Sequence, residues 1–151
     1  MKVAIVSGSV HGSAEEVARH AQGLIKEAGH EVYFNPRATL ADLQAFAPEA
    51  FLAVTSTTGM GELPDNLLPL YSQIRDTLPA VWRGLPGAVI ALGDASYGDT
   101  FCGGGELLRE LFVELGVREV QEMLQLDASE TVTPESDAEP WIAEFVGKLH
   151  G

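Results

Sequence analysis

The sequence predicts a three-layer α/β/α fold, in which helices cover both faces of a five-stranded parallel sheet. Short apolar runs rich in β-branched residues alternate with longer amphipathic segments, the pattern of repeated strand–helix units. The apolar runs are nearly continuous, as in strands that are buried on both faces of a parallel sheet. The length of 151 residues suits one such domain, so we expect a single domain over residues 1–151.

The first half of the chain contains three predicted strands and two predicted helices. Glu15 and Glu16 fit the first turn of a helix, and Gly29 is a helix stop. Thr39 and Asp42 have the spacing of a capping-box variant before a brief helix. In order, the elements are a strand over residues 2–7, a helix ending at Gly29, a strand over 31–35, a short helix after Thr39 and a strand over 50–56.

The second half repeats the alternation. The predicted elements are a helix over residues 64–78, a strand over 88–93, a helix over 103–116, a strand over 118–126 and a helix over 138–149. Pro64 and Asp65 are expected to start the first of these helices. The polar stretch over residues 127–137 is predicted to be a loop within the domain.

Composition excludes several classes of function. The formal net charge of −13 disfavours nucleic acid and anionic membranes as partners, but favours a basic protein surface. A single cysteine, Cys102, excludes a disulfide framework and a multi-cysteine metal site. The apolar runs are too short for a signal peptide or a membrane span, so we expect a cytoplasmic protein that is not membrane-bound.

Three loops at one edge of the predicted sheet are rich in Gly, Ser and Thr. In open parallel sheets, ligands bind beyond the carboxyl ends of the strands, close to the point where the strand order reverses. The loops after the first, third and fourth strands are therefore the candidate site. They cover residues 7–14, 56–66 and 93–104.

The first loop suits a phosphate group. Its glycines allow close backbone approach, the following helix offers free N–H groups, and Ser9 and Ser13 add hydroxyl donors. A nucleotide P-loop is excluded because Ser13 follows Gly12 where Lys is required, and the G-x-x-x-G spacing excludes a dinucleotide fingerprint. An ordinary tight strand–helix turn is the alternative interpretation.

The other two loops suit a planar ring. Tyr97 lies among small and polar residues, where an exposed aromatic could stack on a heterocycle, whereas Phe101 could instead pack under the next helix. The loop over residues 56–66 has hydroxyls beside two glycines, which let backbone groups approach a ring edge. Cys102 is not a phosphatase nucleophile, because the C-x5-R motif would need Arg where Leu108 stands.

The three loops together resemble those of the flavodoxins. The resemblance rests on the order and spacing of Gly8-Ser-Val-His-Gly-Ser13, Ser56-Thr-Thr-Gly-Met-Gly-Glu-Leu-Pro-Asp65, and Leu92-Gly-Asp-Ala-Ser-Tyr97 with Phe101-Cys102-Gly103. It covers essentially the whole chain and is closest to short-chain, YqcA-type flavodoxins, with MioC-type proteins and the FMN domains of diflavin reductases more distant. It implies strand order 2-1-3-4-5 and noncovalently bound FMN at the sheet edge.

Carried onto this sequence, the resemblance implies cofactor-binding residues in all three loops. The phosphate would be wrapped by Ser9, Val10, His11, Gly12, Ser13 and Ala14. One side of the flavin would be lined from the second loop by Ser56, Thr57, Thr58, Gly59, Met60 and Gly61. The third loop would supply Tyr97 for stacking, Leu92, Gly93, Asp94, Ala95 and Ser96 near the ring edge, and Phe101 and Cys102 beneath it.

The implied function is electron transfer between a flavodoxin reductase and redox acceptor proteins, by a monomer without substrate turnover of its own. The flavin loops contain Glu62, Asp65, Asp94 and Asp99, and no Lys or Arg occurs over residues 38–74 or 84–108. This acidity predicts a low potential for the last reduction step, because reduction adds negative charge to the flavin. It also predicts steering of partners with basic surfaces.

Three alternatives belong to other classes. A response-regulator receiver is excluded, because the positions of its acidic pocket and phosphoacceptor Asp hold Ser7-Gly8-Ser9 and Thr55-Ser56-Thr57. A flavin enzyme such as a quinone reductase would need a pyridine-nucleotide pocket, usually on a longer, dimeric chain. Thr58 stands where many flavodoxins have an aromatic residue. A flavodoxin-fold protein with weak or no FMN binding, acting as a protein-interaction module, is therefore the remaining alternative.

Overall fold

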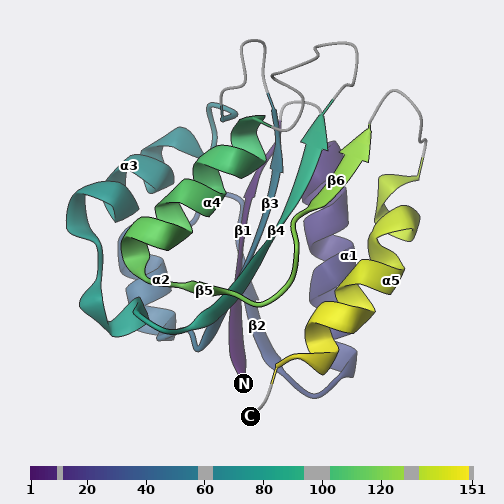
Figure 1. Cartoon of the computed structure of the whole chain (residues 1–151), viewed down its shortest axis with the longest axis horizontal. Helices are drawn as coiled ribbons and strands as arrows, with labels where there is room; N and C mark the ends of the chain where they lie inside the picture. The colour runs from purple at the N-terminus through teal and green to yellow at the C-terminus, as the bar shows by residue number, and fades with distance from the viewer. Residues whose placement is uncertain (10–11, 58–62, 94–102, 128–132, 150–151) are drawn as a thin grey trace.

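A parallel β-sheet forms the centre of the computed structural model (Figure 1), which describes residues 1–9, 12–57, 63–93, 103–127 and 133–149. Its strands are β1 (Lys2–Gly8), β2 (Glu31–Phe34), β3 (Ala50–Ser56), β4 (Pro86–Gly93), β5 (Arg118–Glu119) and β6 (Leu124–Asp127). The order is β2-β1-β3-β4-β5, with β6 also paired to β4, and every pairing is parallel. The predicted fold class and strand order are confirmed.

Helices cover both faces of the sheet. They are α1 (Ser13–Glu27), α2 (Leu40–Phe46), α3 (Leu68–Thr77), α4 (Gly103–Leu115) and α5 (Pro134–Gly147), with a 3₁₀ turn over Ala80–Trp82. Helices α1 and α5 pack on one face, and α2, α3 and α4 pack on the other (Figure 1). Within the described ranges, none of the helices has the length and apolar character needed to cross a bilayer.

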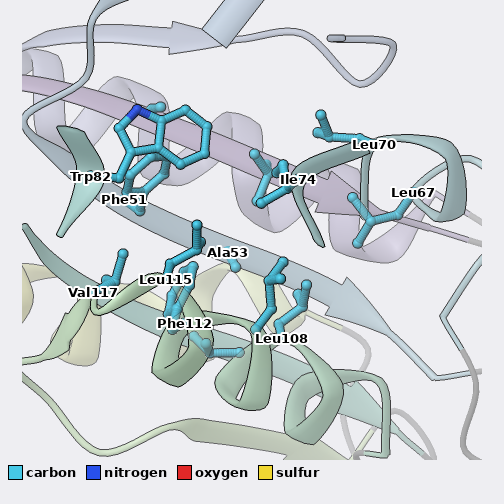
Figure 2. Packing of buried hydrophobic residues seen from close by; sticks show 14 of the residues in the cluster. Phe51, Ala53, Leu67, Leu70, Ile74, Trp82, Leu108, Phe112, Leu115 and Val117 are labelled. Carbon is cyan, nitrogen blue, oxygen red and sulfur yellow. The ribbon is translucent and has the colours of Figure 1, made fainter. Parts of the chain in front are cut away.

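The two core clusters follow from the alternation of side chains along the strands. In β1, Val3 and Ile5 pack toward α1 and α5, whereas Ala4 and Val6 pack toward α3 and α4. On the second side, Phe51 of β3 meets Trp82 edge to face, with ring centroids 4.8 Å apart (Figure 2). Because both faces of the central strands are buried, their carboxyl ends are held in fixed positions relative to one another.

The capping box predicted before the second helix is present. The Asp42 backbone N–H donates to Thr39 Oγ1 at 3.2 Å, and the Thr39 backbone N–H donates to Asp42 Oδ2 at 3.0 Å. Two otherwise unpaired donors at the helix start are thereby satisfied.

The predicted start of the third helix at Pro64 is wrong. Residues 65–67 form a turn, in which the Leu67 N–H donates to the Pro64 carbonyl at 3.0 Å, and α3 begins at Leu68. Pro69, in the first turn of α3, has no N–H to donate to the carbonyl of Asp65. A helix continuous from Pro64 would therefore lack a bond there, whereas Pro69 is tolerated in the first turn.

The predicted loop over residues 127–137 is also wrong at its end. Helix α5 begins at Pro134, four residues before the predicted start at Ala138. Pro134 suits the first helical position, and Glu135 and Asp137 lie in the first turn, where the helix dipole favours negative charge. The last four residues of the predicted loop, 134–137, thus form the start of a helix.

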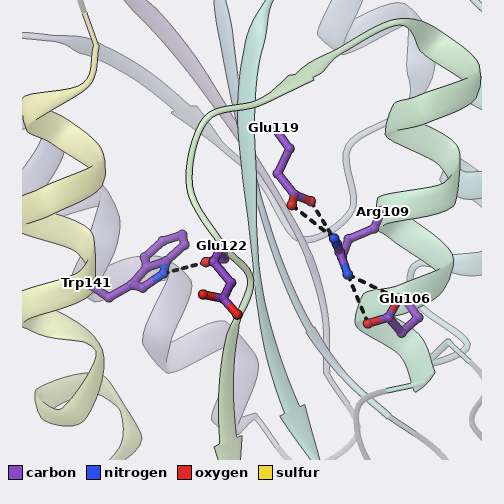
Figure 3. Close-up of polar contacts among 5 residues, drawn as sticks. All are labelled: Glu106, Arg109, Glu119, Glu122 and Trp141. Carbon is purple, nitrogen blue, oxygen red and sulfur yellow. Dashed lines mark hydrogen bonds and ion pairs between the residues drawn. The ribbon is translucent and has the colours of Figure 1, made fainter.

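The predicted fifth strand is divided into β5 and β6. Glu119 pairs with Gly87 and Leu124 pairs with Ile90, so two additional residues bulge out between these pairs. The carbonyl of Glu122 accepts a hydrogen bond from Trp141 Nε1 of α5 at 2.9 Å (Figure 3). Helix α5 therefore satisfies a backbone group of the segment that leaves the sheet.

Candidate functional site

The carboxyl ends of β1, β3 and β4 lie side by side, as predicted for the candidate site. Gly8 pairs with Thr55, and Ser56 pairs with Leu92. The chain leaves β1 for β2 on one side and returns on the other side as β3. This reversal of strand order creates the crevice in which open α/β sheets bind ligands.

The end of β1 presents two buried hydroxyl groups. Ser7 Oγ and Ser9 Oγ are both buried, and neither has a hydrogen-bond partner in the described part of the chain. An unsatisfied buried hydroxyl costs roughly 1–3 kcal/mol, so a ligand that accepts from these groups would recover stability. The predicted phosphate-binding residue Ser9 is thus placed as a donor without a partner.

The start of α1 lies on the same loop and is uncapped. Its N-cap residue is Gly12, with φ 87°, and no described side chain caps the helix, in contrast to Thr39 on α2. The first intrahelical bond runs from the Glu16 N–H to the Gly12 carbonyl at 2.9 Å, which leaves the N–H groups of the first turn outside the helical ladder. Free N–H groups, the helix dipole and serine hydroxyls together suit a phosphate monoester.

The second loop begins with a contact to α4. Thr57 Oγ1 accepts a hydrogen bond from the Gly104 N–H at 3.1 Å. A Cβ at Gly104 would lie 2.7 Å from the Ser56 carbonyl oxygen, so a glycine is required for α4 to start this close to β3. Thr57, which was predicted to line the flavin, therefore links the second loop to α4, the helix that follows the third loop.

Two predicted cofactor-binding residues present no side chain at the sheet edge. Ala14 is fully buried, and Leu92 is 2% exposed within the core that faces α1 and α5. Either residue could reach a ligand only through its backbone. For Gly93, which ends β4, the same holds because it has no side chain.

Ser13 is the first residue of α1. The other predicted site residues not yet placed lie outside the described residues, and their roles stay predictions. They are Val10, His11, Thr58, Gly59, Met60, Gly61, Asp94, Ala95, Ser96, Tyr97, Phe101 and Cys102.

Asn66 is a site residue that the sequence analysis missed. Its Oδ1 accepts from the Ser9 N–H at 2.9 Å, and its Nδ2 donates to the Ser7 carbonyl at 3.4 Å. The sequence did show an asparagine in the second loop, a residue type whose side chain commonly hydrogen-bonds to the backbone. Nothing in the local pattern identified a partner 57 or 59 residues away.

Comparison with known proteins decides the family. The family model for flavodoxin matches residues 5–141. The chain belongs to the flavodoxin family.

Relatives and solved structures agree with this assignment. Flavodoxin YqcA of Pectobacterium carotovorum is 40% identical over 144 residues, covering 93% of this chain and 92% of its own. A solved structure of a mutant flavodoxin from Pseudomonas aeruginosa is 74% identical, with a TM-score of 0.96 and full coverage of both chains. A crystal structure of Fusobacterium nucleatum flavodoxin bound to flavin mononucleotide is 17% identical, has a TM-score of 0.79, covers 99% of each chain and shows the shared fold.

Proposed function

We propose that this chain is an FMN-binding electron carrier that passes electrons from a reductase to redox acceptor proteins. The proposal rests on the buried hydroxyls of Ser7 and Ser9, which have no hydrogen-bond partner among the described residues. They lie beside the start of α1, where no described side chain caps the helix, in a chain of the flavodoxin family. When bound, FMN supplies one- and two-electron redox chemistry that no side chain of the protein provides.

The described groups that would hold the phosphate are neutral donors. No Lys or Arg occurs over residues 38–74 or 84–108, so the second and third loops bring no basic side chain to the phosphate. The donors are the hydroxyls of Ser7 and Ser9 and the first-turn N–H groups of α1, where the helix dipole adds about 0.3–1 kcal/mol. Because Ser7 is 4% exposed, its hydroxyl would bond the phosphate with little competition from water.

The flavin ring would lie between the second and third loops. The Thr57–Gly104 hydrogen bond holds the start of the second loop against α4, so the two loops keep a constant separation at their bases. The predicted ring contacts over residues 58–61 and 93–97 would complete this side of the site.

The charge distribution supports basic redox proteins as partners. Helices that follow parallel strands begin at the carboxyl edge of the sheet, and acidic residues occupy the first turns of α1, α4 and α5: Glu15, Glu16, Glu106, Glu135 and Asp137. Lys26 and Arg75 lie in the last turns of α1 and α3, toward the opposite edge. The negative edge would steer a basic partner toward the flavin, with screening beyond about 8 Å at physiological salt.

We also propose that the protein is a monomer in the cytoplasm and turns over no substrate by itself. The single cysteine suits a reducing compartment. With NADPH as the only reductant and no partner protein, we expect no turnover by the FMN-loaded protein. Sustained NADPH oxidation would instead support a flavin enzyme.

The experiment that tests the proposal is a titration of the apoprotein with FMN, in which flavin fluorescence is measured. We expect stoichiometric binding with quenched fluorescence, and weaker binding in a Ser9→Ala variant, since a phosphate donor is lost. Reduction of the loaded protein by a basic reductase should slow as ionic strength rises. Failure of the wild-type protein to retain FMN would favour the interaction module that Thr58 suggests.

A further inference from the structure

We propose that Asn66 is a positioning residue for the phosphate loop, whose side-chain amide holds the end of β1 so that the Ser9 hydroxyl is directed at the bound phosphate. The inference rests on the proposed function, because it assumes that FMN occupies the site. It assigns Asn66 a role in binding the phosphate end of the cofactor through Ser9 rather than by direct contact.

The amide bonds to the backbone on both sides of Gly8. Oδ1 of Asn66 accepts from the Ser9 N–H at 2.9 Å, and Nδ2 donates to the Ser7 carbonyl at 3.4 Å. These are the two bonds that a residue of a parallel strand facing Gly8 would make through its own backbone. The side chain of Asn66 thus replaces a strand partner at the end of β1.

The end of β1 needs such a partner. In the register of the described strands, β2 pairs only as far as Ile5, so β3 alone continues beside β1 as far as Gly8. Backbone groups on the side of β1 that β3 does not occupy therefore need another partner. Asn66 supplies it from the turn that precedes α3.

The position of Asn66 is fixed by its neighbours. Leu63 and Leu67 are each 2% exposed, and the Leu67 N–H closes the turn onto the Pro64 carbonyl at 3.0 Å. A Cβ at Gly8 would lie 2.8 Å from Leu67 Cβ, so the two segments cross at van der Waals contact. The close contact between the Leu67 segment and Gly8 therefore holds the Asn66 amide beside β1.

This geometry decides what Ser9 offers to a ligand. Its N–H is already donated to Asn66, whereas its Oγ is buried and has no partner in the described part of the chain. Ser9 therefore serves the phosphate through its hydroxyl, whose position depends on the backbone that Asn66 holds. The same bonds tie the phosphate loop to the loop that lines the flavin.

The test compares FMN with riboflavin, which lacks the phosphate. Apoproteins of the wild type and of Asn66→Leu, which has similar volume but no hydrogen-bonding group, are titrated with each ligand and with inorganic phosphate. We expect Asn66→Leu to weaken binding of FMN and of inorganic phosphate by about tenfold, and binding of riboflavin by much less. The Ser9 amide resonance of the apoprotein should also shift, since its N–H loses an acceptor.

The matched control is Asn35→Leu. Oδ1 of Asn35 accepts from the Arg37 N–H at the same distance of 2.9 Å, in the turn after β2. Asn35→Leu should lower stability against urea by a comparable amount and leave the ratio of riboflavin to FMN dissociation constants unchanged. The inference is overturned if the ratio of riboflavin to FMN dissociation constants is the same for Asn66→Leu as for the wild type. This holds whether both affinities are unchanged or both fall by the same factor. A wild-type protein that binds neither FMN nor inorganic phosphate overturns the proposed function as well.

Discussion

Gly105 of α4 packs directly on Ala91 of β4. A Cβ built at Gly105 would lie 2.5 Å from Ala91 Cβ and 2.7 Å from Met123 Sδ, well inside van der Waals contact. The first turn of α4 therefore approaches the sheet more closely than any other residue type would permit. Because Gly104 contacts the end of β3 in the same turn, this close packing also sets where α4 begins beside the candidate site.

Gly105→Ala should destabilise the protein by about 1–3 kcal/mol, since the added methyl group overpacks the contact with β4. The matched control is Gly23→Ala in α1, where nothing lies within 4 Å of the added Cβ and alanine should stabilise the helix by about 0.5–1 kcal/mol. Urea unfolding of the apoproteins measures both. A Gly105→Ala protein as stable as the wild type would show that moving α4 away from β4 costs no more than alanine gains in helix propensity.

His30 should make the protein less stable in acid. The N-terminal ammonium of Met1 donates to His30 Nδ1 at 3.2 Å. Burial, and then the charge of that ammonium, lower the pKa of His30 below its usual value of 6.5. The folded state therefore binds fewer protons than the unfolded state, so this stability is fully present above pH 6.5 and is lost as the pH falls through the lowered pKa.

The measurement for His30 is urea unfolding at about pH 7.5 and about pH 5, for the wild type and for His30→Gln. The wild type should lose more stability between these two values than the variant does, because glutamine does not titrate. If both proteins lost the same amount, acid sensitivity would arise from other groups alone.

Asp65→Asn should raise the potential of the last reduction step of bound FMN, an expectation that rests on the proposed function. Asp65 is exposed at the end of the second loop, in the turn over residues 65–67 that precedes α3. For an assumed separation of roughly 10 Å in water, removing one negative charge is worth at most about 0.4 kcal/mol, or on the order of 20 mV, before salt screening, so the titration is made at low ionic strength. Redox titration of the two loaded proteins measures the difference.

Asp76→Asn is the control for Asp65, since it makes the same change in the last turn of the ten-residue helix α3. This position lies about 15 Å farther along the helix, where the Coulomb energy of one charge is smaller and salt screening is stronger, so its variant should shift the potential by less than Asp65→Asn does. Equal shifts in both variants would indicate an effect of net charge rather than of position. A wild-type potential above that of free FMN would contradict the predicted low value.

Local patterns predicted most of the fold. β3 was predicted with its observed bounds, and the Thr39–Asp42 capping box was recognised from two residues at the correct spacing. Gly29 was predicted to stop the first helix and adopts φ 95° there. Each of these signals depends on backbone preferences or on side chains within a few residues, which the sequence displays directly.

The two wrong helix starts, of α3 and α5, depend on prolines within the local sequence, whereas the division of the fifth strand depends on distant residues. Residues 118–126 have the composition of one strand, but Trp141 of α5 bonds the Glu122 carbonyl and a bulge separates β5 from β6. Arg109 of α4 then pairs with Glu119 at 2.8 Å on the other side of the bulge (Figure 3). Arg109 lies 10 residues from Glu119 in the sequence, and Trp141 lies 19 residues from Glu122.

The sequence by itself determined the alternation of strands and helices, the three Gly- and Ser-rich loops and the family to which they point. Only the tertiary structure decided which groups at the sheet edge are already bonded and which remain for a ligand. Asn66 accepts the hydrogen bond of the Ser9 N–H, and Thr57 accepts that of the Gly104 N–H. The hydroxyls of Ser7 and Ser9, by contrast, have no partner among the described residues. Hydrogen-bond partners at the edge of a parallel sheet come from separate crossover units, so periodicity within any one segment carries no record of them.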